Sequence, residues 1–138
     1  MTERITTRTT ILWLDDEGFA RMETRDDAQV TIEDAREVIR ASETLIQGKQ
    51  RPVLSDITKL RSISREARSI TSRTAVERYT AAAIVVGSPI SRAIGNFFIG
   101  LHKPAIPTRL FSSVEEGLAW LREQSRGGAQ SGGGSRSR

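Results

Sequence analysis

The sequence contains no cysteine and only one histidine, and both scarcities limit its chemistry. Without cysteine there is no disulfide framework, no thiolate metal ligand and no cysteine nucleophile. A single histidine excludes any mechanism that needs a histidine pair. The stretch Arg51–Ile70 holds no glycine-rich phosphate loop, no nucleophile with a base beside it and no metal-ligand cluster. We therefore expect a protein that is not an enzyme and that needs no cofactor or metal.

Long apolar runs are also missing. The first ten residues, MTERITTRTT, lack the apolar stretch that a signal peptide requires. No segment approaches the roughly 20 apolar residues that a membrane-spanning helix needs. The expected location is therefore the cytoplasm, with no transmembrane segment.

Most of the chain also has nearly equal numbers of basic and acidic residues. The formal net charge is +4, but Arg126, Arg136 and Arg138 lie at the C-terminal end, and the remainder has 18 basic against 17 acidic residues. A nucleic-acid-binding domain would gather Lys and Arg on one face. A specific nucleic-acid partner is therefore not expected.

What the sequence does contain is an alternation of strand and helix patterns. β-branched and aromatic residues at alternating positions predict strands, whereas apolar residues at helical spacing after a capping residue predict helices. The predicted strands are a hairpin of Thr9–Leu14 and Phe19–Thr24, then Pro52–Ile57, Ala81–Val86 and an edge strand Thr108–Phe111. Four helices are predicted. The first begins after Thr31 and ends at Gly48, the second runs from Ser64 to about Tyr79, and the third spans Pro89–Leu101. The fourth begins at the capping boxes Ser112/Glu115 and Ser113/Glu116.

This order predicts an α/β fold with a mixed, mainly parallel sheet of about five strands, an N-terminal hairpin and about four helices. The length of 138 residues fits one domain. We expect an N-terminal segment at residues 1–8, a single domain at 9–125, and a flexible tail at 126–138, where Gly, Ser and Arg leave nothing to bury.

The element order, with the stretch VLSDITKLRSISREAR at its middle, resembles the STAS or SpoIIAA-like fold of anti-sigma-factor antagonists. The later stretch VVGSPISRAIGNFFIGL, followed by KPAIPTRLFSSVEEGLAWL, looks more like the small uncharacterised bacterial proteins grouped as STAS/SEC14-like. The similarity covers about Thr9–Gln124. It implies a regulatory domain that binds a protein partner.

The resemblance can be followed to one motif. In anti-sigma-factor antagonists an Asp-Ser-Ser-Gly-type motif follows the second long strand, and the partner kinase phosphorylates one of its serines. Aligning Val53–Leu60 with that strand and turn puts Ser64 at the aspartate, Arg65 and Glu66 at the serines, and Ala67 at the glycine. The phosphoacceptor position is therefore not a serine in this chain.

The residues around this motif form the first candidate site. Ser62 and Ser64 are nearby hydroxyls, and Arg61, Arg65 and Arg68 would hold a phosphate or dock an acidic partner. The simpler interpretations are that Ser64 caps a helix and that the basic run is a solvated helix face.

A second candidate site lies where the helix at Pro89 begins. Gly87 and Ser88 offer backbone amides at a helix start, and Arg92 follows one turn later, an arrangement that suits an anion. The alternative is an ordinary strand-to-helix turn.

The same helix carries more apolar residues than one sheet face requires. Ile90, Ile94, Phe97 and Leu101 share one face, whereas Phe98 and Ile99 project beside it. Burial beneath the Lys103–Pro107 loop would explain this surplus. Otherwise a second copy of the chain, another partner or a lipid chain covers it, and Phe97, Phe98 and Ile99 become candidates for self-association as a homodimer.

Two further features have simple explanations. Asp15, Asp16 and Glu17 precede Gly18 and are typical of a hairpin turn, although they could resemble a carboxylate cluster. His102 follows a helix and suits the negative end of its dipole. Two functional hypotheses remain: a non-enzymatic STAS-like module that docks a protein through Ser62–Arg68, or a carrier or sensor of a small lipid-like or anionic ligand.

Overall fold

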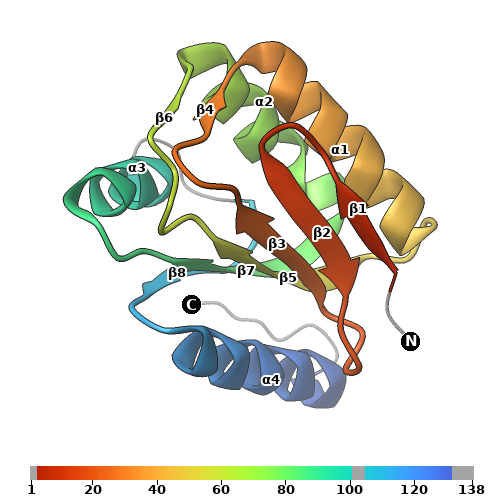
Figure 1. Cartoon of the computed structure of the whole chain (residues 1–138). Helices are drawn as coiled ribbons and strands as arrows, with labels where there is room; N and C mark the ends of the chain where they lie inside the picture. Colours follow the sequence, from red (N-terminus) through yellow and green to blue (C-terminus); the bar gives the residue numbers. More distant parts are fainter. Residues whose placement is uncertain (1–2, 101–104, 132–138) are drawn as a thin grey trace.

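A mixed β-sheet forms the centre of the molecule, with helices packed on both of its faces (Figure 1). The computed structural model describes residues 3–100 and 105–131. The sheet has six strands in the order β1-β2-β3-β5-β7-β8. Antiparallel pairing joins β1, β2 and β3, and parallel pairing joins β3, β5, β7 and β8. The strands are β1 (Arg4–Thr6), β2 (Thr10–Leu14), β3 (Ala20–Thr24), β5 (Arg51–Asp56), β7 (Tyr79–Val85) and β8 (Thr108–Phe111).

A second, two-stranded parallel sheet lies beside the first and pairs β4 (Gln29–Val30) with β6 (Ser62–Ile63). Helices α1, α2 and α3 cover one face of the main sheet, and α4 covers the other (Figure 1). Their bounds are α1 (Ile32–Ile46), α2 (Arg65–Thr74), a short 3-10 helix η1 (Ala75–Glu77), α3 (Pro89–Gly100) and α4 (Val114–Ser131). No helix in the described ranges is both long enough and apolar enough to cross a bilayer.

The predicted hairpin is β2 and β3, and its turn explains the acidic residues. The Asp15 carboxylate accepts hydrogen bonds from the amides of Glu17 and Phe19, at 2.9 and 3.0 Å. Gly18 has a φ of 83°, which favours glycine. The Asp15 carboxylate therefore stabilises the turn, whereas the Glu17 carboxylate pairs with Arg122 of α4.

Local capping starts α1 and α4 at residues that the sequence predicted. Thr31 caps α1 in a reciprocal capping box with Asp34. At the other end Gln47 is left-handed, with a φ of 50°, and Gly48 follows with a φ of 80°. The α4 start uses Ser113, whose hydroxyl accepts the Glu116 amide at 3.2 Å.

Several boundaries differ from the prediction. The segment predicted to precede the domain contains β1, in which Ile5 pairs with Leu12 of β2, so the sheet has one strand more than expected. The second predicted helix ends earlier, because Tyr79 already begins β7. Helix α4 continues to Ser131, into the stretch predicted to be a flexible tail. Residues 132–138 of that tail lie outside the described residues.

Apolar side chains fill both faces of the sheet. On the α4 face, Phe19, Leu54 and Leu121 pack with the alanines of β7. Gly117 lets α4 approach this face closely, since a Cβ at that position would lie 3.0 Å from Leu54 Cδ1 and 3.3 Å from the Ala83 Cβ. On the opposite face, the core consists of Ala28, Ile57, Leu60, Ile84 and Val86, with Ile94 and Phe98 packed against it.

Candidate functional site

The junction between β5 and α2 is held in place by backbone hydrogen bonds to the segment around β4. The amides of Arg61 and Ser62 donate to the Ala28 carbonyl at 2.9 and 3.3 Å, and the Ser64 amide donates to the Val30 carbonyl at 2.9 Å. Ile57 and Leu60 anchor the same stretch in the core. The junction therefore presents its remaining side chains from a fixed backbone.

Those side chains form a basic surface. Arg61, Ser62 and Arg65 are exposed, and Arg68 is half-buried. We call these four residues the junction surface. Within the described part of the chain, none of its arginines lies in an ion pair.

Ser64 has the structural role that its position predicts. Its hydroxyl accepts a hydrogen bond from the Ala67 amide at 3.1 Å, and its backbone is extended, as at the start of a helix. Ser64 is half-buried whereas Ser62 is exposed. Ser64 therefore caps α2.

Arg68 connects the junction surface to α3. Its Nη1 donates to the Ile63 carbonyl at 3.2 Å, and its guanidinium carbon lies 3.8 Å from the centroid of the Phe97 ring. This distance is that of a cation–π contact. The structure thus brings together two residues that the sequence assigned to separate candidate sites.

The start of α3 differs from the predicted anion site. The Ser91 hydroxyl accepts the amides of Gly87 and Ser88, both at 2.9 Å, and the Ser88 hydroxyl accepts the Ser91 amide at 3.0 Å. The two amides predicted to bind an anion are therefore already satisfied within the chain. Arg92 is exposed and makes no ion pair in the described residues.

The prediction of which α3 residues face the core was partly wrong. Ser91 and Gly95 are buried, and Ile94 and Phe98 pack on the core, whereas Ile90 is 51% exposed. A Cβ at Gly95 would lie only 2.8 Å from Val86 Cγ1, so small residues set the contact side of the helix. Leu101, part of the predicted face, lies outside the described residues, as does His102.

The candidate self-association residues are all half-buried in the single chain: Phe97, Phe98 and Ile99. Part of Phe98 lies against the core, and Phe97 lies against Arg68. Self-association through these residues stays a prediction.

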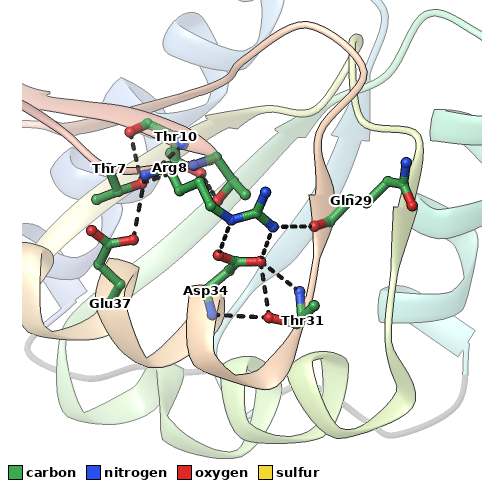
Figure 2. A network of polar contacts seen from close by, with 8 residues as sticks. Thr7, Arg8, Thr10, Gln29, Thr31, Asp34 and Glu37 are labelled. Atoms are coloured by element: carbon green, nitrogen blue, oxygen red, sulfur yellow. Dashed lines mark hydrogen bonds and ion pairs between the residues drawn. The ribbon is translucent and has the colours of Figure 1, made fainter.

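A polar network that the sequence did not reveal lies on the other side of β4 (Figure 2). Arg8 Nε and Nη2 donate to the two oxygens of the Asp34 carboxylate at 2.7 and 2.5 Å, and Nη2 also donates to the Gln29 carbonyl at 2.9 Å. Asp34 in turn accepts the Thr31 amide and hydroxyl, each at 2.9 Å. We call Arg8, Asp34, Thr31 and the Gln29 carbonyl the clamp.

The clamp fixes the charge of Asp34. The hydrogen-bonded Arg8 guanidinium holds the pKa of Asp34 far below its usual range, against the opposing effect of burial, and the hydrogen bonds from Thr31 act in the same direction. The only sequence signal for this site was the spacing of Thr31 and Asp34, which is that of a capping box. No sequence feature near Arg8 indicated that it would pair with Asp34.

No group of three or more His, Asp or Glu side chains is arranged to hold a metal ion within residues 3–100 and 105–131. In that part of the chain the four ion pairs are Arg8–Asp34, Arg21–Asp15, Lys59–Asp26 and Arg122–Glu17.

Comparison with known proteins agrees with this fold. A family model described as "Domain of unknown function (DUF7793)" matches residues 12–125. No curated protein sequence matches significantly. An uncharacterised protein of the DUF3478 family from Shewanella loihica PV-4, which has a SpoIIAA-like fold, is structurally similar with a TM-score of 0.53 and 16% identity, over 88% of this chain and 92% of that one.

A protein of unknown function from Arthrobacter sp. FB24 matches less well in structure, with a TM-score of 0.34 at 26% identity, over 85% of this chain and 95% of that one. The Shewanella structure confirms the SpoIIAA-like fold that the sequence resemblance implied.

Proposed function

The chain belongs to the DUF7793 family, and we propose that it is a non-enzymatic regulatory module that docks a protein partner through the junction surface. The observation that carries this proposal is the set of arginines without ion pairs at a rigidly held junction, among the residues that the structure describes. The SpoIIAA-like fold supports it as an analogy only.

The fixed backbone favours binding. A loop that is already ordered loses little conformational entropy when a partner docks, so more of the contact energy contributes to affinity. Three backbone hydrogen bonds to Ala28 and Val30 order the junction before any partner arrives. Its exposed side chains then need only adjust their rotamers.

The charge of the surface indicates the chemistry of the partner. Arg61, Arg65 and Arg68 carry positive charge, and the acidic residue in the first turn of α2 is Glu66. Arginine binds carboxylates through two parallel hydrogen bonds and is enriched where proteins meet. The partner is therefore a protein with an acidic segment, whose association rate falls as salt is added.

Arg68 adds an anchor that a loose basic tail would lack. Its contact with the Phe97 ring and its bond to the Ile63 carbonyl hold the guanidinium in one place. A partner that covers Arg68 would also reach Phe97, so docking would extend onto α3.

The test begins with purification of the tagged full chain from cells of its source and identification of proteins that co-purify. The affinity of the identified partner is then measured for R61E/R65E and for R36E/R40E, a matched double charge reversal at exposed positions on α1. We expect the junction variant to bind about 100-fold more weakly and the α1 variant to bind nearly as the unmodified chain does. Equal affinities of the unmodified chain, R61E/R65E and R36E/R40E for the partner would show that the junction surface is not the docking site.

A further inference from the structure

A cleft of about 420 Å³ lies between α3, β8 and the start of α4. Its apolar lining consists of Val86, Leu110 and Phe111, and its polar lining of Arg92, Arg109, Ser112 and Glu116. Val86 directly follows β7 and Ser112 directly follows β8. The cleft therefore lies at the carboxyl ends of parallel strands, the edge at which α/β sheets commonly bind ligands.

Two arginines from separate elements line this cleft. Arg92 belongs to the first turns of α3, and Arg109 to the edge strand β8, where its guanidinium carbon lies 5.6 Å from the Phe111 ring centroid. Neither forms an ion pair among the residues described. Glu116 supplies the opposing charge, so the side chains of the lining carry a net charge of one positive unit.

The donors for an anion here are side chains. The amides of Gly87 and Ser88 are already taken by the Ser91 hydroxyl, and Ser113 is occupied in capping α4. Two guanidinium groups offer the planar donor pairs that match a carboxylate or phosphate. The Ser112 hydroxyl is a further donor beside them.

The apolar lining narrows the ligand class further. Leu110 and Phe111 are half-buried and border the cleft from consecutive positions at the end of β8, Leu110 on the α3 side of the sheet and Phe111 on the α4 side. The volume lies in the range of small-molecule sites, and such sites combine an apolar lining with a few polar groups that orient the ligand. A bare inorganic ion would leave this apolar surface unused.

We propose that the cleft binds a small organic anion, with its carboxylate or phosphate group on Arg92 and Arg109 and its apolar body across the end of β8, where Leu110 and Phe111 border the cleft. This site is separate from the junction surface, because none of its lining residues belongs to that surface. The two proposals therefore succeed or fail independently.

The test is a titration of the ¹⁵N-labelled full chain with benzoate, with phenyl phosphate and with inorganic phosphate, followed by amide chemical shifts. We expect saturable shifts at Val86, Ser112 and Glu116, and affinity about tenfold higher for phenyl phosphate than for inorganic phosphate, because only the former has an apolar body. Binding of benzoate alone would assign a carboxylate ligand, and binding of phenyl phosphate alone a phosphorylated one.

Variants separate a specific site from general attraction to basic protein. R92A and R109A should each weaken binding about tenfold, E116Q should strengthen it severalfold, and R73A, a matched exposed arginine on α2, should leave it unchanged. Unchanged far-UV circular dichroism would establish that each variant folds. Failure of both organic probes to shift these amides would overturn the proposal. So would binding by R92A and R109A as tight as that of the unmodified chain, or shifts confined to Ser62–Arg68.

Discussion

The clamp and the junction surface lie on opposite sides of β4 and use arginine in opposite ways. In the clamp, Arg8 is bound through two hydrogen bonds to a buried carboxylate and a third to the Gln29 carbonyl. At the junction, Arg61 and Arg65 extend from the surface without an ion pair among the described residues. The difference separates charge that holds the fold from charge that is left for a partner.

The short strand β4 connects these two regions. Arg8 holds the Gln29 carbonyl on one side, while Gln29 pairs with Ser62 and Val30 pairs with Ile63 on the other. The clamp thus supports the strand to which the junction is attached. Changes to the clamp should affect stability first, and changes to the junction surface should affect binding first.

The largest effect on stability is expected from D34A. The change removes the acceptor of Arg8 and half of the α1 capping box, so the free energy of unfolding should fall by about 2 kcal/mol. Urea denaturation measures this change. The matched control is E33A, an exposed acid in the same helical turn, which should change stability by less than about 0.5 kcal/mol.

If D34A and E33A were equally stable, the clamp would not be what holds α1 and β4 together.

The clamp also predicts an acid-sensitive stability. The pKa of Asp34 is lowered in the folded chain. The Asp34 carboxylate therefore contributes fully to folding stability above the unfolded-state pKa of about 3.9, and this contribution is lost as the pH falls below that value. Stability of the unmodified chain should therefore decrease more steeply than that of D34N between about pH 5 and pH 2. Parallel pH profiles for the two proteins would contradict the assignment.

Ser64 provides a smaller test, on the junction side. S64A removes the acceptor for the Ala67 amide and should cost about 1 kcal/mol, the usual value of a helix N-cap. S62A, at an exposed position two residues earlier, should leave the free energy of unfolding nearly unchanged. A larger loss for S62A than for S64A would refute the assignment of Ser64 as the cap.

The smallest predicted effect concerns Arg68 and Phe97. Their coupling in a double-mutant cycle of R68A, F97A and the combined variant should be about 0.5 kcal/mol, as for partly exposed cation–π pairs. A coupling of zero would mean that the two side chains act independently, and would weaken the argument that docking extends onto α3.

Features with local signals could be predicted from the sequence. Thr31 and Ser64 both cap helices, and the alternating residues of the hairpin form β2 and β3. Caps and turns depend on residues a few positions apart, so a short stretch of sequence is enough to identify them. The resemblance to the SpoIIAA-like fold rested on the order of these elements together with the stretch VLSDITKLRSISREAR, and the Shewanella structure confirms it.

Features that depend on distant residues could not be predicted. Arg8 and Asp34 lie 26 positions apart, and the pairing of β4 with β6 joins two-residue strands that have no periodicity of their own. On α3, apolar spacing predicted the contact of Ile94 with the core but wrongly included the exposed Ile90. The close approach to Val86 occurs at Gly95, a residue that a hydrophobic pattern does not include. The structure was needed to find the clamp and the cleft.

The separation of fold-holding and partner-binding arginines is tested most directly by urea unfolding of R8A alongside R61A/R65A. We expect a clearly lower unfolding midpoint for R8A, because Asp34 loses its partner and the Gln29 carbonyl loses a donor. We expect the midpoint of R61A/R65A to equal that of the unmodified chain. A midpoint for R61A/R65A as low as that of R8A would refute this separation, since the junction arginines would then also be holding the fold.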